Sequence, residues 1–420
     1  MGKVAVIHPD LGVGGAERLI VDASKALQEF GHDVRIYTSS HDKSRCFEET
    51  RDGTLRVSTI GGWIPRSIFG RCFALMAYLK IIYIAIYISI FSKYDLILCD
   101  QVAACIPVLR LKFWSKCKIV FYCHFPDQLL TQRDSLLKSI YRKPIDLFEE
   151  LSTQAADVIL VNSKFTESVV KRTFKSLENR ELTILYPCVD VDYLRNFEPV
   201  LSDCSEIVRE CKRLSRDNFV FLSLNRFERK KNLALAVEAL AECLLTCPGP
   251  TNQQKPHAHP QASTMKAHLI VAGGYDERLL ECVQYYQELE RRVRALELET
   301  HVTLVKSPSD QEKVLLLALS HAIVYTPERE HFGIVPLEAM AMSKPVIACC
   351  SGGPLETVEA GVSGLLCDSD ERSFADAMMR LYGDRLASER MGEAGLRRVQ
   401  LLFSYHTFRN RLNQICFPER

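Results

Sequence analysis

The sequence lacks an excess of charge of either sign. Its 53 Lys and Arg residues and 52 Asp and Glu residues leave a net charge of +1 over 420 residues. Proteins that bind nucleic acid usually carry a strongly basic face, so this balance argues against that class and we expect no nucleic-acid partner. An anionic ligand would have to be met by local clusters of charge.

The sequence also lacks the cysteine spacing of a disulfide framework or a zinc site. Its 16 cysteines include no Cys-x-x-Cys pair, and it contains no Asn-x-Ser/Thr glycosylation acceptor. Cys349 and Cys350 are vicinal, but no histidines stand at zinc-ligand spacing from them. The pattern is typical of reduced cytosolic thiols. No Asp-rich metal loop is evident either, so we expect neither a metal nor a cofactor.

A cleavable signal peptide and a dinucleotide fingerprint are missing from the start of the chain. Residues 3–9 form too short an apolar run, ended by a proline, and are predicted to form a first buried strand. Gly14 and Gly15 follow, but Glu17 stands where a dinucleotide loop needs its third glycine, which disfavours NAD. The two glycines suit close approach of a phosphate or a sugar, with a structural turn as the alternative.

Short buried strands and amphipathic helices alternate along the rest of the chain. This alternation over 420 residues predicts an α/β fold with two consecutive domains. The polar stretch 196–217 is predicted to be an irregular linker, which divides the chain into domains 1–198 and 199–390. Residues 391–420 are predicted to form a helical tail packed across the junction. The stretch 247–266 is rich in Pro, Gln and His and is predicted to be a disordered surface insertion.

One long hydrophobic run, residues 68–91, lies within the first domain. Lys80 interrupts its middle at a cost of roughly 2.5–3.5 kcal/mol for a charge at the centre of a membrane helix. We therefore expect an immersed or monotopic helix more than a true span, with a core helix as the alternative. Arg66 and Arg71 flank the run, and these two residues and Lys80 are candidates for holding lipid head groups.

Two carboxylates separated by seven residues, Glu330 and Glu338, are the most informative feature. Pro336 between them suits the first turn of a helix, which predicts a loop followed by a helix over about 337–342. Helix capping alone also favours an acid here, but a second glycine-rich turn, 351–354, follows a strand nearby in the chain. The backbone N–H groups at the helix start would form an anion cradle, centred on Phe332, Gly333 and Ile334.

Charged residues also follow buried strands elsewhere. His124 follows the strand 118–123, and ligands of open α/β sheets bind at the carboxyl ends of strands. Arg226 and Lys231 follow the strand 219–224, close enough to converge on one diphosphate, although a solvated charge run is the alternative. With the two carboxylates, these residues suit a nucleotide-sugar: the cations would neutralise the diphosphate, one carboxylate would bind the ribose, and the other would face the hexose.

The motifs resemble those of the family-4 retaining glycosyltransferases of GT-B fold. Glu330 and Glu338 match the family's E-x7-E motif, and Arg226 and Lys231 match its diphosphate-binding pair. Gly14-Gly15 is similar to its N-terminal glycine loop. Within the family, the stretches 8–18, 121–127, 226–233, 271–278 and 330–340 are similar to α-1,3/1,6-mannosyltransferases of dolichol-linked N-glycan precursor synthesis.

The resemblance implies two Rossmann-like domains with an inter-domain cleft, the first on the acceptor side and the second binding the donor. It implies GDP-mannose as donor, mannosyl-GlcNAc2-diphosphodolichol as acceptor, and a site at the cytosolic face of the endoplasmic reticulum membrane. Neighbouring mannosyltransferases of the pathway are further candidate partners. By the same resemblance Glu330 contacts the transferred mannose, Glu338 the ribose, and His124 the sugar on the acceptor side.

Three questions stay open at this point. Retention of configuration is expected through front-face attack, with double displacement by a carboxylate nucleophile about 5 Å from its partner as the competing mechanism. Another lipid acceptor, such as phosphatidylinositol, would fit the same fold. A catalytically idle membrane scaffold for neighbouring glycosyltransferases is the alternative from a different functional class.

Overall fold

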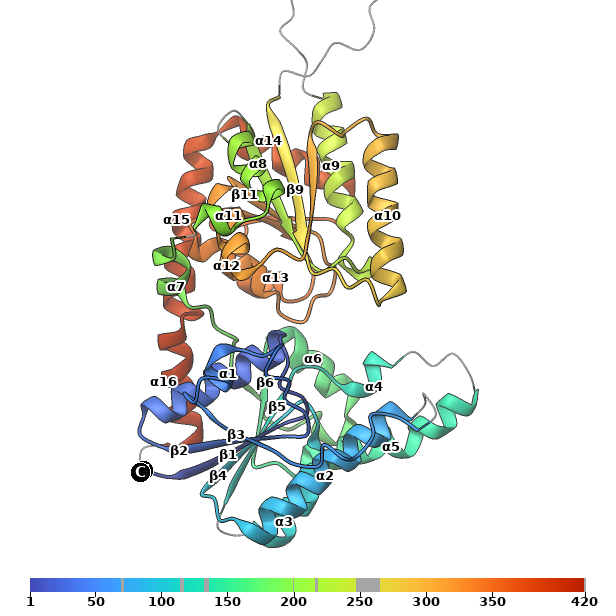
Figure 1. Ribbon diagram of the computed structural model, residues 1–420, viewed down its shortest axis with the longest axis vertical. Helices are drawn as coiled ribbons and strands as arrows, with labels where there is room; N and C mark the ends of the chain where they lie inside the picture. The colour runs from blue at the N-terminus through green and yellow to red at the C-terminus, as the bar shows by residue number, and fades with distance from the viewer. Residues whose placement is uncertain are drawn as a thin grey trace, which may run out of the picture. The chain divides into compact units, whose positions relative to one another are not determined.

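The chain forms two compact units. The computed structural model describes residues 1–68, 72–113, 117–131, 136–198, 200–215, 218–246 and 265–418. The first unit comprises Met1–Cys188 and Tyr405–Arg420, and the second comprises Val189–Ser404 (Figure 1). The first boundary thus lies at Cys188 rather than after residue 198. The C-terminal tail is divided, because α15 (Arg385–Leu402) belongs to the second unit and α16 (Tyr405–Cys416) to the first.

The first unit is built on a seven-stranded parallel sheet in the order β3-β2-β1-β4-β5-β6-β7. Ile7 of β1 pairs with Tyr37 of β2 and with Cys99 of β4, so these strands end at one edge of the sheet. The strands are β1 (Lys3–His8), β2 (Asp33–Thr38), β3 (Arg56–Thr59), β4 (Leu96–Asp100), β5 (Lys118–Cys123), β6 (Val158–Val161) and β7 (Thr183–Ile184).

Helices cover both faces of this sheet. Val4 and Val6 of β1 face a core with α1 and α16, whereas Ala5 and Ile7 face a core with α2, α3 and α6. Burial on both faces explains why the strands are continuous apolar runs. The helices of this unit, apart from α16, are α1 (Gly15–Glu29), α2 (Phe73–Phe91), α3 (Ile106–Phe113), α4 (Asp127–Leu130), α5 (Leu136–Gln154) and α6 (Lys164–Thr173).

The long hydrophobic run forms α2, which begins at Phe73 rather than at residue 68. Within the described residues it is the one helix long and apolar enough to cross a membrane by length and composition. Its inner side, including Ile81 and Ile84, packs on the sheet. Lys80 lies on the buried side and is only 9% exposed. The outer side carries exposed apolar residues, among them Phe73, Leu79, Ile86 and Ile90.

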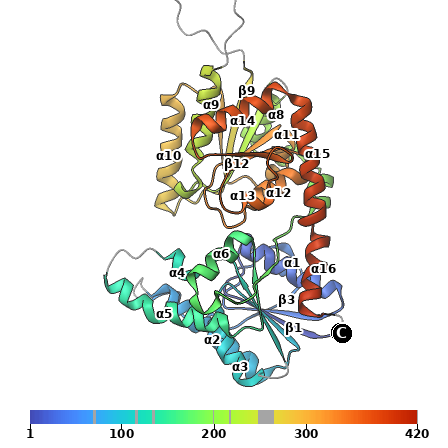
Figure 2. The same ribbon diagram turned by 180° about the vertical axis from the view of Figure 1, so that it is seen from behind.

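The second unit is built on a six-stranded parallel sheet in the order β10-β9-β8-β11-β12-β13. Helices α9, α10 and α14 pack on one face, and α8, α11, α12 and α15 lie on the other (Figures 1 and 2). The strands are β8 (Phe219–Leu224), β9 (Ala267–Gly273), β10 (Val302–Lys306), β11 (Ala322–Tyr325), β12 (Val346–Cys349) and β13 (Gly364–Cys367). Its remaining helices are α7 (Val191–Asn196), α8 (Glu206–Leu214), α9 (Leu233–Thr246), α10 (Leu280–Ala295), α11 (Asp310–Leu319), α12 (Ile334–Ala341), α13 (Pro354–Thr357) and α14 (Glu371–Gly383).

The expectation of an irregular linker over 196–217 is wrong. The stretch holds a 3₁₀ turn, Leu201–Asp203, and helix α8, which buries Val208 and Cys211. Two apolar residues three apart suffice to dock a short helix, and the surrounding charges concealed this spacing. The predicted insertion, 247–266, lies outside the described residues except for Met265 and Lys266, and Met265 is buried at the start of β9. The cysteines that the structure describes are free thiols.

Candidate functional site

In the second unit the predicted site residues gather at the carboxyl ends of the neighbouring strands β8, β11 and β12. Lys231 follows β8 in the 3₁₀ turn Arg229–Lys231, and Glu330 lies in the loop after β11. Their side chains meet directly, with Nζ of Lys231 2.5 Å from Oε2 of Glu330. The side chains are 11% and 23% exposed, so the pair is largely shielded from water and weakly screened.

Backbone contacts fix this loop against its neighbours. The hydroxyl of Thr326 donates to the carbonyl of Lys231 at 2.7 Å, and the N–H of Gly353 donates to the carbonyl of Glu330 at 2.7 Å. A Cβ on Gly353 would lie 2.2 Å from the carbonyl oxygen of Phe332, so only glycine fits there. The glycine-rich turn 351–354 therefore lies directly against the loop that carries Glu330.

Helix α12 begins at Ile334, earlier than the predicted residue 337. Gly333 is its N-cap, in the left-handed region with φ of 84°, and makes no side-chain cap hydrogen bond. The first N–H groups of a helix have no partner within the helix, so a ligand can accept from them. Phe332 is buried at the side of this turn, with its ring 6.0 Å from that of Phe403.

Glu338 is held in the first turns of α12 by a lysine from a different helix. Nζ of Lys313, on α11, lies 2.5 Å from Oε1 of Glu338. The other oxygen, Oε2, is buried and has no hydrogen-bond partner among the described residues. One oxygen is thus charge-neutralised, and the other can accept a hydrogen bond from a ligand hydroxyl.

Arg226 lies on the same loop as Lys231 but pairs with a different carboxylate. Its Nη1 is 2.8 Å from Oε1 of Glu228, and its side chain is 62% exposed. Gly274 lies next to it, since a Cβ there would come 3.2 Å from the Arg226 side chain. Of the two predicted diphosphate-binding residues, Arg226 is therefore the accessible one and Lys231 the shielded one.

In the first unit three neighbouring strands bring together a histidine, a carboxylate and a second histidine. His8 ends β1, Asp100 ends β4, and His124 follows β5. Nδ1 of His8 lies 2.8 Å from Oδ2 of Asp100, and Nε2 of His124 lies 2.9 Å from Oδ1. Asp100 is fully buried, whereas the His124 side chain is 21% exposed. Asp100 thus holds both rings, and His124 is the member that a ligand can reach.

Electrostatics favour an ionised Asp100 and a charged His8. Burial alone would lower the pKa of His8, but the hydrogen bonds and charges of Asp100 and Glu17 raise it to about 9. Burial likewise opposes ionisation of Asp100, yet the charges and hydrogen bonds of His124 and His8 lower its pKa. An ionised carboxylate only accepts, so Nε2 of His124 carries a proton and donates to Oδ1, and Nδ1 is the ring nitrogen that Asp100 does not hold.

The N-terminal glycine loop lies beside this group. Gly14 is the N-cap of α1 and Gly15 its first residue, without a side-chain cap hydrogen bond. A Cβ on Gly15 would meet no atom within 4 Å, whereas one on Gly14 would meet the end of the Glu17 side chain at 2.4 Å. Glu17 in turn lies 3.8 Å from His8. A side chain at residue 15 would therefore fit without a clash within the protein.

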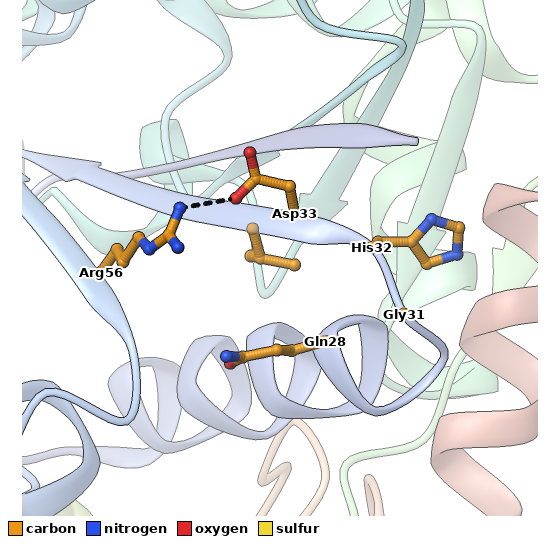
Figure 3. Close-up of a pocket in the computed structure, with 6 residues that line it drawn as sticks. Gln28, Gly31, His32, Asp33 and Arg56 are labelled. Carbon is orange, nitrogen blue, oxygen red and sulfur yellow. Dashed lines mark hydrogen bonds and ion pairs between the residues drawn. The ribbon is translucent and has the colours of Figure 1, made fainter. Parts of the chain in front are cut away.

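Two hollows of the first unit lie at the opposite edge of its sheet, where the strands begin. One of about 360 Å³ is lined by Gln28, Gly31, His32, Val34 and the ion pair of Asp33 and Arg56 (Figure 3). It opens at the amino end of β2, and a second hollow adjoins it at the start of β1. Ligands of open α/β sheets bind at the carboxyl ends of the strands, so neither hollow belongs to the candidate site.

The structure places the residues proposed for lipid contact as follows. Arg66 is exposed, with Nη2 3.4 Å from Asp10, and Lys80 is buried in α2. Burial lowers the pKa of Lys80, and the charge of Arg66 adds to this. Arg71 lies outside the described residues. No group of three or more His, Cys, Asp or Glu suited to a metal occurs within the described parts of the chain.

Sequence reasoning missed three residues of these two groups. His8 and Asp100 each end a buried strand, the same signal that selected His124, so applying the strand-end rule to every strand would have found them. Lys313 gives no such signal, because its partner Glu338 lies 25 residues away on another helix.

The comparisons with known proteins cover both units. Residues 13–193 match the family described as Glycosyltransferase Family 4, and residues 205–398 match the family described as Glycosyl transferases group 1. The chain is 46% identical to the human Alpha-1,3/1,6-mannosyltransferase ALG2 over 98% of its own length and 94% of the relative's. It is 42% identical to the enzyme of that name from Dictyostelium discoideum, over 98% and 97%.

Solved structures share the fold at lower identity. Sucrose-phosphate synthase from Thermosynechococcus elongatus superposes with a TM-score of 0.75 at 22% identity, over 99% of this chain and 98% of that one. WaaG, a glycosyltransferase involved in lipopolysaccharide biosynthesis, superposes with a TM-score of 0.66 at 15% identity, over 99% and 100%. With two parallel, Rossmann-like sheets and relatives matched along almost its whole length, the chain belongs to the α-1,3/1,6-mannosyltransferases, a family of GT-B glycosyltransferases.

Proposed function

We propose that this protein transfers two mannoses from GDP-mannose to mannosyl-GlcNAc2-diphosphodolichol, first through an α-1,3 and then through an α-1,6 linkage. The observation that carries the proposal is the pair of lysine-held carboxylates, Glu330 and Glu338, in a chain that matches α-1,3/1,6-mannosyltransferases over 98% of its length. The proposed acceptor is a membrane lipid, and we propose that the reaction takes place at the cytosolic face of the endoplasmic reticulum membrane.

The second unit supplies the donor side of the reaction. Arg226 and Lys231 neutralise the charge that builds up on the diphosphate as the bond from the anomeric carbon to the phosphate oxygen breaks. The N–H groups around Phe332, Gly333 and Ile334 bind the same diphosphate at the positive end of α12. The buried Oε2 of Glu338 accepts a hydrogen bond from a ribose hydroxyl.

Glu330 faces the transferred mannose. Its carboxylate stabilises the positive charge that develops at the anomeric carbon, and its contact with Lys231 orients it beside the departing phosphate. In the front-face step, the acceptor oxygen forms a bond to the anomeric carbon on the same face from which GDP departs. The departing phosphate oxygen takes the proton of the acceptor hydroxyl. Configuration is thereby retained.

The first unit supplies the acceptor side. Nδ1 of His124 makes a hydrogen bond with a sugar hydroxyl of the acceptor, while Gly14 and Gly15 contribute to donor binding by permitting close approach of the donor to the backbone. Arg226 and Lys231 neutralise the charge of the leaving group, so the proposed mechanism needs no metal ion. Full activity after treatment with EDTA is the expected result, and restoration of a lost activity by added Mg²⁺ or Mn²⁺ would contradict it.

The test is to incubate membrane-reconstituted protein with GDP-mannose and, in separate reactions, a lipid diphosphate carrying mannosyl-GlcNAc2 or phosphatidylinositol, then determine product masses and linkages. Two added mannoses, one sensitive to an α-1,3- and one to an α-1,6-specific mannosidase, are expected. A product only on phosphatidylinositol would instead identify another lipid acceptor. Donor binding without transfer to either lipid would identify a non-catalytic scaffold for neighbouring mannosyltransferases.

Double displacement is the competing mechanism for the same reaction. It requires a carboxylate nucleophile, which would be Glu330, and a covalent mannosyl-enzyme intermediate. Mass spectrometry of protein quenched during turnover with GDP-mannose distinguishes the two, because a mannosyl adduct on Glu330 is expected only for double displacement.

A further inference from the structure

Helix α5 in the first unit buries charged side chains and exposes aliphatic ones. It turns the charged side chains Arg142, Asp146 and Glu149 inward, where each is buried. The exposed aliphatic side chains are Leu136, Ile140, Leu147 and Leu151, which are 83%, 63%, 58% and 52% exposed. A surface helix normally shows the opposite pattern, and buried charge together with an exposed apolar stripe is the informative exception.

The inward side of α5 is anchored by ion pairs and hydrogen bonds. Arg142 lies 3.0 Å from both Asp127 and Asp146. The carboxylate of Glu149 accepts the backbone N–H groups of Asp127 at 2.6 Å and Gln128 at 3.1 Å. Rotation of α5 to hide its apolar residues would break these contacts. The outward direction of the aliphatic side chains is therefore enforced by the fold.

The exposed aliphatic residues form one continuous stripe. Steps of four, seven and four residues separate Leu136, Ile140, Leu147 and Leu151, and this spacing places them on one side of a helix. Up to Leu151, the other exposed residues of α5 that the structure describes are Lys143 and Pro144, whereas Asp146 and Glu149 face inward. Glu150, half-exposed beside Leu147, accepts the backbone N–H of Ser176 at 2.7 Å. The stripe thus combines aliphatic side chains with a cation, and the nearest carboxylate is held by the backbone of a neighbouring segment.

The neighbouring helix α2 has the same reversal. Its one charged residue, Lys80, is buried, while Phe73, Leu79, Ile86 and Ile90 are exposed. The two helices pack together through Tyr78 and Ile82 of α2 and Tyr141, Ile145 and Phe148 of α5. Both views show them side by side (Figures 1 and 2). Two adjacent helices therefore each expose apolar side chains, and α2 has the composition to enter a membrane.

We infer that the α5 stripe, made of Leu136, Ile140, Lys143, Leu147 and Leu151, lies on a lipid bilayer as a second contact beside α2. A helix that lies in a membrane interface buries an apolar side in the acyl chains and favours cations near anionic head groups, which is the composition of this stripe. Protein interfaces are centred on Trp, Tyr and Arg anchors, and the stripe contains none of these. The inference deepens the proposed function, whose acceptor is a membrane lipid.

The experiment uses the full chain with vesicles of phosphatidylcholine and phosphatidylserine that contain a photoactivatable phosphatidylcholine. After irradiation, the labelled peptides are identified by mass spectrometry. Label on peptides covering 136–151, in addition to those of α2, is expected. Label confined to α2, or absent from both helices, would overturn the inference. Neither donor nor acceptor is present, so the result does not depend on mannosyl transfer.

A pair of matched variants separates docking from folding. Leu147→Gln with Leu151→Gln is expected to lower the ratio of α5 to α2 label by about tenfold, since two leucines lose their favourable transfer into lipid. Leu386→Gln with Leu401→Gln on α15, at positions 70% and 72% exposed, is expected to leave the ratio unchanged. An equal fall in both variants would contradict the inference. The inference would also be contradicted if α5 took no lipid label and the protein formed a dimer in lipid-free buffer that the α5 substitutions dissociate.

Discussion

Lys231 and Glu330 are 99 residues apart in the chain and form an ion pair of 2.5 Å at the carboxyl edge of the second sheet. The pair joins a residue proposed to bind the diphosphate to one proposed to face the mannose. Removing either partner would leave a largely shielded charge without its counterion. The two side chains are therefore expected to act on the reaction together rather than independently.

Glu330→Ala is expected to lose far more turnover than donor affinity. An electrostatic group that acts mainly in the transition state is worth about 10²–10³ in kcat. GDP-mannose binding should change by only about threefold, because the ground state lacks the charge that Glu330 stabilises. Single-turnover rates and calorimetric titration with GDP-mannose measure the two effects. Equal losses in rate and affinity would contradict the assignment.

Lys313→Met and Glu338→Ala are expected to weaken donor binding with little effect on turnover. Lys313 neutralises one oxygen of Glu338, and the other oxygen is proposed to accept from the ribose in both the ground and transition states. We expect KM for GDP-mannose to rise about tenfold, the worth of one charge-assisted hydrogen bond, with kcat within about threefold of wild type.

Lys344→Met is the matched control for Lys313→Met. Lys344 is also a lysine of the second unit, but its Nζ donates at 2.8 Å to the carbonyl of Ala318 and contacts neither carboxylate of the motif. It should leave KM unchanged even if it lowers thermal stability. A rise in KM in both variants would show that the effect comes from a general loosening of the unit.

The candidate site was predicted from sequence where its residues are close in the chain or follow a buried strand. Glu330 and Glu338 form a local motif, and strand ends selected His124, Arg226 and Lys231. The contact between Lys231 and Glu330 could not be predicted from spacing, because it depends on β8 and β11 being neighbours in the sheet. Lys313 escaped for the same reason, since only the packing of α11 beside α12 brings it to Glu338.

The alternation of strands and helices predicted the fold class, because buried parallel strands are continuous apolar runs. Helix α8 was missed because its apolar side is only one turn wide among charged residues. For α5 the sequence predicts a helix only over about 145–155, because in the N-terminal part the aliphatic residues face outward while Arg142 is buried, which reverses the usual hydrophobic pattern. Prediction of helices from hydrophobic patterns fails where tertiary contacts bury charged side chains or leave apolar ones exposed.

Gly15→Ala is expected to leave stability unchanged and to reduce activity. A Cβ at this position meets no protein atom within 4 Å, and alanine is favoured in the first turn of a helix at least as well as glycine. Any loss of transfer then reports that the substrate approaches the backbone here. We expect at least a tenfold fall in kcat/KM, roughly the cost of a displaced substrate, without a lower melting temperature. Unchanged kcat/KM would remove Gly15 from the site.

Gly353→Ala is expected to show the opposite balance. Its Cβ would lie 2.2 Å from the carbonyl oxygen of Phe332, so the turn must move and with it the loop that carries Glu330. Stability and activity should fall together, with a loss of about 1–3 kcal/mol in the free energy of unfolding, which is typical of overpacking. Denaturation followed by circular dichroism measures this loss. A stable variant with normal activity would show that the two glycine turns are not coupled.

The buried pair of His8 and Asp100 predicts how stability depends on pH. His8 has a pKa of about 9 in the folded protein against about 6.5 when unfolded, so its contribution is complete below pH 6.5 and is lost as the pH rises through 9. Asp100 has a lowered pKa, so its contribution is present above about pH 4 and is lost as the pH falls further. The first unit should therefore be most stable between about pH 4 and 6.5 with respect to this pair.

His8→Asn isolates the alkaline part of this dependence. Wild type should lose on the order of 3 kcal/mol in the free energy of unfolding of the first unit between pH 6 and pH 10, and the variant clearly less, because it has no imidazolium to deprotonate. The chain has two tryptophans, both within residues 1–188 of the sequence, and Trp63 packs edge to face on Tyr83, so tryptophan fluorescence during urea denaturation reports on the first unit. Thiols and other groups that titrate in this range are common to both proteins and cancel in the difference. Parallel pH profiles would show that His8 does not carry a proton in the folded protein.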